Sequence, residues 1–245
     1  MASCAAVPGP PVVLAKGVWR MPTIGRSAVN SFAFEESDGS VTLVDAGVRG
    51  ATKRVVAHLD AIGKQPEQVR RIVLTHAHFD HVGDARRLRE RTGGRTCIHE
   101  DDAEFMRSGK APPLDRSLRL ARIAAMVPSG SIGGGPVDET FTDNELLDVA
   151  GGLRALHTPG HTPGHCSFLH EPTGVLITGD SLFNWRSRMR YSFALFCSNF
   201  RLCTETADRL GEVQYEVAAF THGPEIRDRA RDSVRAFLQR RLRAG

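Results

Sequence analysis

Three histidines and one aspartate stand close together in the segment Thr75-His76-Ala77-His78-Phe79-Asp80-His81. Neutral imidazoles and carboxylates are ligands that suit zinc, iron, manganese or nickel. The segment contains no cysteine, and cysteines dominate closed structural zinc sites. This spacing therefore favours a catalytic metal site over a polar surface loop whose histidines are accidental.

A second histidine cluster repeats a His-Thr-Pro-Gly unit between His157 and His165, with His161 in the middle. Its prolines and glycines fix turns and allow the backbone to pass close to a metal. Farther along, Asp180 ends an apolar run, where a carboxylate could bind two cations, one through each oxygen, and reduce their mutual repulsion. His222 lies in Thr221-His222-Gly223-Pro224. Taken alone, it is equally consistent with a metal ligand and with a structural histidine in the core.

Four short apolar runs, each read as a buried strand, lead directly into these polar residues. They are Val41–Val44 before Asp45, Ile72–Leu74 before Thr75-His76, Val175–Ile177 before Thr178-Gly179-Asp180, and Val217–Phe220 before Thr221-His222. Helical patterns lie between them, at Val55, Val56, Leu59 and Ile62 and, near the C-terminus, at Ile226, Ala230, Val234, Phe237 and Leu238. A further helix is expected over Ala111–Pro128 and a glycine-rich loop over Gly130–Pro136. The alternation predicts an α/β fold in which helices cover the sheets.

Composition predicts one domain over residues 1–245, with residues 1–16 as a loosely ordered N-terminal extension. The net charge is only +4 and is spread along the chain, so no nucleic-acid partner is expected. Arginines 86, 87, 89, 91 and 95 are interpreted as the solvated face of a helix. No signal peptide or membrane-spanning apolar run is visible, and the five cysteines are scattered, which favours reduced thiols in the cytoplasm.

The ordered set Asp45, His76–His81, His161, Asp180 and His222 resembles the metallo-β-lactamase-fold hydrolase superfamily, which includes glyoxalase II-like and lactonase-like enzymes. The resemblance covers the chain from about Gly17 onward and implies a four-layered αββα sandwich with metals at the edge where the sheets meet. It assigns His76, His78 and His161 to one metal, Asp80, His81 and His222 to a second, and Asp180 to both. It implies two divalent ions, zinc first, with iron or manganese as alternatives. Asp45 matches an aspartate that braces the metal loop, and His165 is expected to support the site without binding metal.

Two such cations would activate water for attack on a carbonyl, with Asp80 as the catalytic residue that orients the nucleophile. An ester, thioester, lactone or amide of a small molecule is therefore the expected substrate. A mononuclear-iron persulfide dioxygenase, a phosphodiesterase or nuclease, and a metal-free binding protein are the alternatives. The segment Ser181–Arg188 lacks the Gly-Gly-Cys-Gly-Arg type of continuation of glyoxalase II and persulfide dioxygenases, which weakens both assignments. Asp180 itself disfavours a true β-lactamase.

The segment Phe183–Phe196 follows Asp180 and is expected to form the substrate pocket. Trp185 and Tyr191 would supply apolar walls, while Arg186, Arg188 and Arg190 would pair with an anionic group. The alternative is that the aromatics form core contacts or the interface of a homodimer and that the arginines face water. Elsewhere, His58, His99 and His170 are interpreted as structural or solvated, His157 as orienting a turn, and Cys166 as a buried apolar residue.

Overall fold

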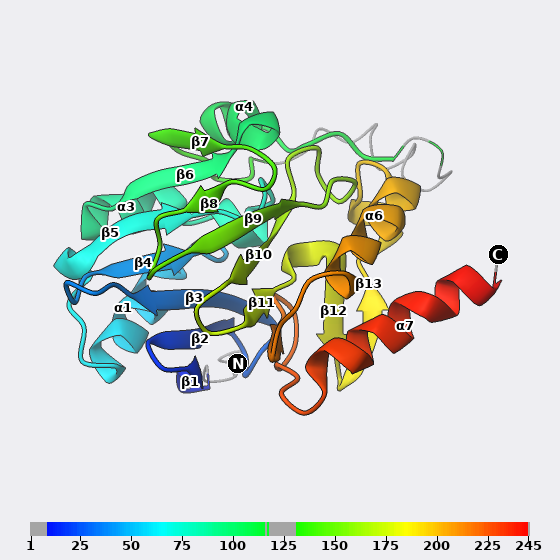
Figure 1. The fold of residues 1–245 in the computed structure, drawn as a ribbon. Coiled ribbons are helices and arrows are strands. Elements are labelled where there is room, and N and C mark those ends of the chain that lie inside the picture. Colours follow the sequence, from blue (N-terminus) through cyan, green and yellow to red (C-terminus); the bar gives the residue numbers. More distant parts are fainter. Residues whose placement is uncertain (1–8, 116, 118–130, 245) are drawn as a thin grey trace, which may run out of the picture.

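Two β-sheets pack face to face in the computed structural model, and helices cover their outer faces (Figure 1). The structure describes residues 9–115, 117 and 131–244. Most of the helix expected over Ala111–Pro128 and the start of the expected glycine-rich loop lie outside the described residues. Within the described ones, no helix is long and apolar enough to cross a membrane.

The first sheet has seven strands and the second has five. The order of the first is β1 (Val12–Ala15), β2 (Val18–Ile24), β3 (Val29–Glu35), β4 (Val41–Val44), β5 (Val69–Val73), β6 (Arg95–His99) and β7 (Glu139–Phe141). The order of the second is β14 (Val217–Ala219), β11 (Val175–Ile177), β10 (Cys166–His170), β9 (Leu153–His157) and β8 (Leu146–Leu147). A separate hairpin consists of β12 (Leu182–Trp185) and β13 (Arg188–Tyr191).

The α-helices are α1 (Thr52–Ala61), α2 (Phe79–Val82), α3 (Ala85–Thr92), α4 (Glu100–Ser108), α6 (Phe200–Thr206) and α7 (Ala230–Ala244). Short 3-10 turns are η1 (Pro66–Gln68), η2 (Gly179–Ser181), η3 (Ala194–Phe196) and η4 (Ala207–Gly211). The expected α1 buries Val55 and Leu59, and α3 exposes Arg86, Arg87 and Arg91 as expected for a solvated face.

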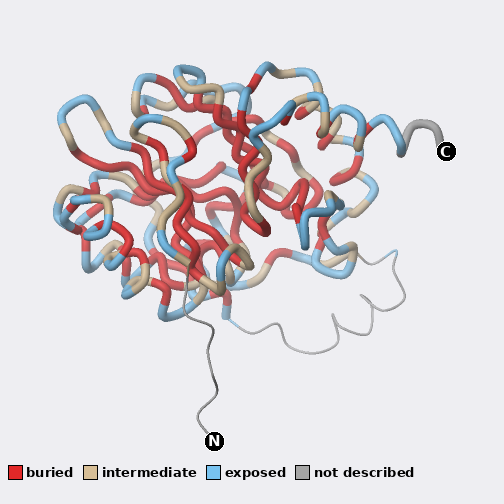
Figure 2. Tube along the Cα trace, turned by 90° about the horizontal axis from the view of Figure 1, so that it is seen from below, coloured by how far each residue is buried: buried red, intermediate tan, exposed pale blue. Residues whose placement is uncertain are grey.

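Strand alternation divides the core into three layers. In β3, Phe32 and Phe34 point between the two sheets, whereas Ala33 points toward α1, α3 and α4. On the far side of the second sheet, Leu176 packs under η4 and α7, against residues such as Leu210. Figure 2 shows buried chain segments in the middle of the molecule and exposed segments mainly at its periphery. The layers confirm the four-layered αββα sandwich.

Two expectations about the chain near its ends need correction. Residues 12–15 are not loose but form β1, where Leu14 is buried and Arg227 donates to the backbone oxygens of Val13 and Leu14. Ile226 does not belong to the last helix. Its backbone exchanges two hydrogen bonds with Ala218 (2.8 and 2.9 Å), so it continues the second sheet, and α7 begins only at Ala230.

Candidate metal centre

The loop after β5 carries the first histidine cluster, and Asp45 holds this loop from behind. The Asp45 carboxylate accepts hydrogen bonds from the backbone N–H (2.8 Å) and hydroxyl (2.9 Å) of Thr75 and lies 2.8 Å from Nδ1 of His81. Its backbone has φ 64°, a conformation that is uncommon outside glycine and tends to occur at functional sites. Because Asp45 occupies Nδ1, it turns Nε2 of His81 toward the interior of the site.

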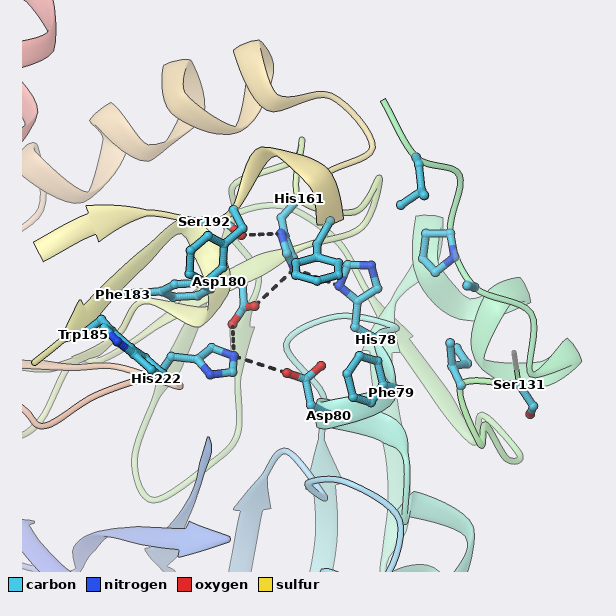
Figure 3. A pocket seen from close by; sticks show the side chains of 16 residues that line it. His78, Phe79, Asp80, Ser131, His161, Asp180, Phe183, Trp185, Ser192 and His222 are labelled. Carbon is cyan, nitrogen blue, oxygen red and sulfur yellow. Dashed lines mark hydrogen bonds and ion pairs between the residues drawn. The ribbon is translucent and has the colours of Figure 1, made fainter. Parts of the chain in front are cut away.

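The seven side chains assigned as ligands by the resemblance converge in three overlapping groups. In each group the candidate ligand atoms lie within 4.8 Å of one another. The groups are His76, His78 and His161; Asp80, His81 and His222; and His76, His81 and Asp180. Figure 3 shows the members that also line a cavity, with His161, Asp180 and His222 facing His78 and Asp80.

Asp180 lies between the two histidine sets, and each of its oxygens faces one of them. Its Oδ2 is 3.2 Å from Nε2 of His161, while Oδ1 is 3.3 Å from Nε2 of both His81 and His222. Burial alone would raise the pKa of Asp180, yet the adjacent histidines, His222 first, hold it well below its ordinary value. The carboxylate is therefore ionised and placed to serve two cations.

The buried ring nitrogens in this site fit metal ions. Nε2 of His76 and Nε2 of His81 are buried and make no hydrogen bond, which is unfavourable unless a cation binds there. On His222, Nδ1 donates to the Ala28 carbonyl (2.7 Å), and Nδ1 of His161 lies 2.8 Å from the Ser192 hydroxyl. Outer contacts of this kind orient metal-binding histidines and leave the opposite nitrogen for the metal.

His165 is absent from all three groups because both of its nitrogens are occupied. Nδ1 donates to the Thr158 carbonyl (2.9 Å), and Nε2 accepts from the backbone N–H of Asp180 (2.7 Å). Burial lowers the pKa of His165 to about 3, so the ring is neutral. Gly179 allows this contact, because a Cβ at its position, with φ 52°, would lie 2.5 Å from His165 Nε2. His165 thus positions the Asp180 backbone.

Asp102 is a buried residue of this site that sequence reasoning missed. Its Oδ2 accepts from the backbone N–H of Ala77 (2.8 Å) and the hydroxyl of Thr162 (2.6 Å), and its Oδ1 from the N–H of Gly164 (2.7 Å). It therefore joins the two histidine-bearing loops. Nothing near Asp102 in the sequence marks it, because its partners lie 25 and about 60 residues away.

The remaining histidines are structural. Nε2 of His58 lies 2.9 Å from the Pro22 carbonyl, and Nε2 of His170 lies 3.0 Å from that of Ala150. His99 is buried at the start of α4, where its Nδ1 accepts from the Asp101 N–H (3.3 Å). Its ring stacks on His157 with the centroids 4.1 Å apart.

A cavity of about 490 Å³ opens onto the metal centre and is walled largely by aromatic side chains. Trp185 lines this cavity, as expected. Arg186, Arg188 and Arg190 instead line an adjoining hollow together with Trp185. The structure does not bring Tyr191 to either space, because strand alternation turns it toward α7, where its ring packs 5.0 Å from that of Phe237.

Comparisons with known proteins point to one family. The sequence profile described as the metallo-beta-lactamase superfamily matches residues 24–222. YobT of Bacillus subtilis is 37% identical over 158 residues, which are 62% of this chain and 61% of that protein. Hydroxyacylglutathione hydrolase GloC of Haemophilus influenzae is 28% identical over 150 residues, which are 60% of this chain and 64% of that one. The chain thus spans less than two thirds of the length of these relatives.

Solved structures agree with this match. A metallo-beta-lactamase family protein of Thermus thermophilus has a TM-score of 0.68 and 26% identity, with coverage of 95% of this chain and 82% of that one. A metallo-beta-lactamase of Cronobacter sakazakii, at 20% identity, has a TM-score of 0.71 over 98% and 96% of the two chains, which shows a shared fold. The profile match, the αββα sandwich and the convergence of histidines and aspartates at one sheet edge agree: the chain belongs to the metallo-beta-lactamase superfamily.

Proposed function

We propose that this protein is a dinuclear metallohydrolase that cleaves a carbonyl ester, thioester or lactone. The observation that carries the proposal is the position of Asp180, whose two oxygens each face a separate set of histidines. His76, His78 and His161 would hold one ion, and Asp80, His81 and His222 the other. Zinc is the ion we propose, because the imidazole-rich set suits it and hydrolysis needs no redox change.

When bound, two such cations make hydroxide available near neutral pH and polarise the substrate carbonyl. The protein side chains then have distinct tasks. Asp80 lines the cavity, and its Oδ2 lies 3.4 Å from Nε2 of His222, so this carboxylate is placed to orient the attacking water. Asp45, His165 and Ser192 fix the direction of His81, Asp180 and His161 from outside. Asp45 and His165 do so from behind the ligands, whereas Ser192 also lines the cavity. Such contacts keep the metal-binding side chains in place.

The candidate metal site and one relative support this substrate class. GloC is named for the hydrolysis of hydroxyacylglutathione, which supports acyl transfer to water as the reaction type here. We expect a small-molecule substrate and no nucleic-acid or membrane partner. We also propose a cytoplasmic location, which the free thiols of Cys97, Cys166, Cys197 and Cys203 support.

Metal analysis and an activity panel test this function together. The purified protein is loaded with zinc, iron or manganese, its metal content per chain is measured by mass spectrometry, and hydrolysis of esters, thioesters and lactones is followed. We expect about two ions per chain and hydrolysis of at least one substrate class, and a loss of at least a hundredfold in His78→Ala. Oxygen consumption with a persulfide by the iron form, without hydrolysis of any panel member, would mean that the protein is a dioxygenase.

A further inference from the structure

The cavity beside the metal centre presents apolar side chains to a ligand. Phe79, Phe183, Trp185, Phe193 and Phe196 line it, and among the described lining residues there is no lysine or arginine. Four of these five aromatics are at least 37% exposed, although large apolar side chains are normally covered. They make up four of the seven large hydrophobic residues that are exposed in the described parts of the chain. This concentration marks a binding surface for an apolar group.

Phe183 and Trp185 also connect the cavity to a group of arginines. In the β12–β13 hairpin, Phe183 is paired with Arg190 and Trp185 with Arg188. Side chains of directly opposed residues share one face of a sheet, with Cβ atoms about 4.5–5.5 Å apart. The opposite face of the hairpin packs into the protein through Leu182, Met189 and Tyr191. The face that carries the aromatic wall therefore also carries arginines.

These arginines are not neutralised within the described protein. Arg186, Arg188 and Arg190 are exposed and line one hollow with Trp185, and their guanidinium groups form no ion pair or hydrogen bond with another described residue. By contrast, other exposed arginines, such as Arg91 with Glu67 and Arg201 with Glu205, have acidic partners. Three uncompensated guanidinium groups attract an anion, and their planar donors suit carboxylates and phosphates.

We propose that the substrate is an anionic amphiphile, an inference that rests on the hydrolase function above. Its apolar group fills the aromatic cavity, its scissile carbonyl lies at the metal centre, and its carboxylate or phosphate reaches past Trp185 to Arg188 and Arg190. A second hollow, lined by Arg49, Arg86 and Arg87, shares Phe79 with the cavity. It also contains Asp84, whose negative charge opposes anion binding, so the hairpin arginines are the preferred site.

Binding can be measured without turnover, which separates this proposal from the hydrolase assignment. The chain has two tryptophans, so a Trp19→Phe background leaves Trp185 as the fluorescent reporter. In metal-loaded protein, we titrate octyl phosphate, octanoate, uncharged octyl glucoside, ethyl phosphate and inorganic phosphate. The Kd for octyl phosphate or octanoate should be at least tenfold lower than that for octyl glucoside. Ethyl phosphate and inorganic phosphate should bind at least tenfold more weakly than octyl phosphate. The comparison of octyl phosphate with octanoate tells which anion is preferred.

An anion can also bind a metal ion directly, so affinity for an anionic ligand does not by itself identify the arginines as its site. Arginine variants distinguish the two sites. Arg188→Gln and Arg190→Gln should each weaken binding of the anionic octyl ligand about tenfold and leave octyl glucoside unchanged. The matched controls, Arg86→Gln and Arg87→Gln, should bind every ligand as the parent protein does. The proposal is overturned if the hairpin variants bind anions normally, if the control variants are the ones that lose affinity, or if chain length makes no difference. If the protein binds these ligands as expected but hydrolyses no ester, thioester or lactone, the binding proposal stands and only the proposed hydrolase function fails.

Discussion

At the scale of single residues, Asp102 determines how the two histidine-bearing loops sit against each other. Its two oxygens accept three hydrogen bonds, from the backbone N–H groups of Ala77 and Gly164 and from the hydroxyl of Thr162. In Asp102→Asn, one oxygen becomes an NH₂ group that faces a donor. We expect the free energy of unfolding to fall by about 1–3 kcal/mol and metal affinity to fall at least tenfold.

Urea unfolding and a competitive chelator titration measure these two effects of the Asp102 change. Asp101→Asn is the matched control, because Asp101 is the preceding residue of the same helix but is 53% exposed in its side chain. Its unfolding free energy should stay within about 0.5 kcal/mol of the parent value. Equal behaviour of the two variants would show that Asp102 does not align the loops.

Asp180 offers a second residue-scale test, now of the bridge itself. Asp180→Ala removes the carboxylate that faces both histidine sets but leaves the apolar strand β11 before it intact. We expect the metal content to fall from about two ions per chain to about one, with a change in folding that is small by comparison. Mass spectrometry of the dialysed protein and its circular dichroism spectrum give the two readings. Retention of two ions with full activity would rule out the bridging role.

Residues of the candidate centre differ in how far the sequence could predict them. His76, His78 and His81 stand together in one motif, so their convergence follows from local spacing after a strand. Ser192 and Asp102 act through partners from distant loops, and only the packing of those loops makes them visible. Contacts of this kind depend on the tertiary structure, which no local pattern encodes.

At the scale of elements, strands were easier to predict than helix ends. Val41–Val44 and Val175–Ile177 match β4 and β11 because buried strands are short, β-branched and bounded by turns. The sequence predicts too early a start for the last helix, because Ile226 has the spacing of a helical residue. Its backbone instead pairs with Ala218, and Arg229 then adopts φ 47°, which separates this pairing from the start of α7. The backbone pairing with Ala218 therefore overrides the local helical periodicity at Ile226.

The junction between β6 and α4 should make stability depend on pH through His99. Burial and, secondarily, the charge of His157 lower the pKa of His99 to about 4, below its ordinary value of 6.5. The unfolded chain therefore binds the proton more readily between these values, and stability must decrease as pH falls from about 6.5 to 4. One proton contributes at most about 1.4 kcal/mol per pH unit.

His99→Asn should remove this contribution while keeping the start of the helix. An asparagine can still accept the hydrogen bond from the Asp101 N–H, as helix N-caps do. Urea unfolding of chelator-treated parent and variant at several pH values between 7 and 4 gives the difference, in which the titration of groups distant from His99 cancels. As the pH falls, the free energy of unfolding should decrease more steeply in the parent protein than in the variant. Parallel curves would mean that His99 is protonated equally in both states.

At the scale of the whole molecule, the metal centre joins the two halves of the sandwich. His76, His78 and His81 follow β5 of the seven-stranded sheet, whereas His161, Asp180 and His222 come after β9, β11 and β14 of the five-stranded sheet. The core between the sheets, with Phe32 and Phe168, holds them together independently of the site. Ions bound there would therefore add a cross-link at one edge of an already folded structure.

Metal removal should lower the melting temperature without unfolding the protein. A ligand present at about a thousand times its Kd stabilises the native state by about 4 kcal/mol per site, and in a chain of this size each kcal/mol shifts Tm by about 2–4 °C. Chelation should therefore lower Tm by about 8–16 °C for one tightly held ion, and added zinc should restore it.

Scanning calorimetry with parallel metal analysis measures this change in Tm, with His222→Asn as the comparison. That variant loses a ligand on only one side of Asp180, so it should show a smaller drop on chelation because it retains chiefly the other ion. A chelated protein that contains no metal yet melts within about 2 °C of the loaded form would show that the ions do not link the two halves.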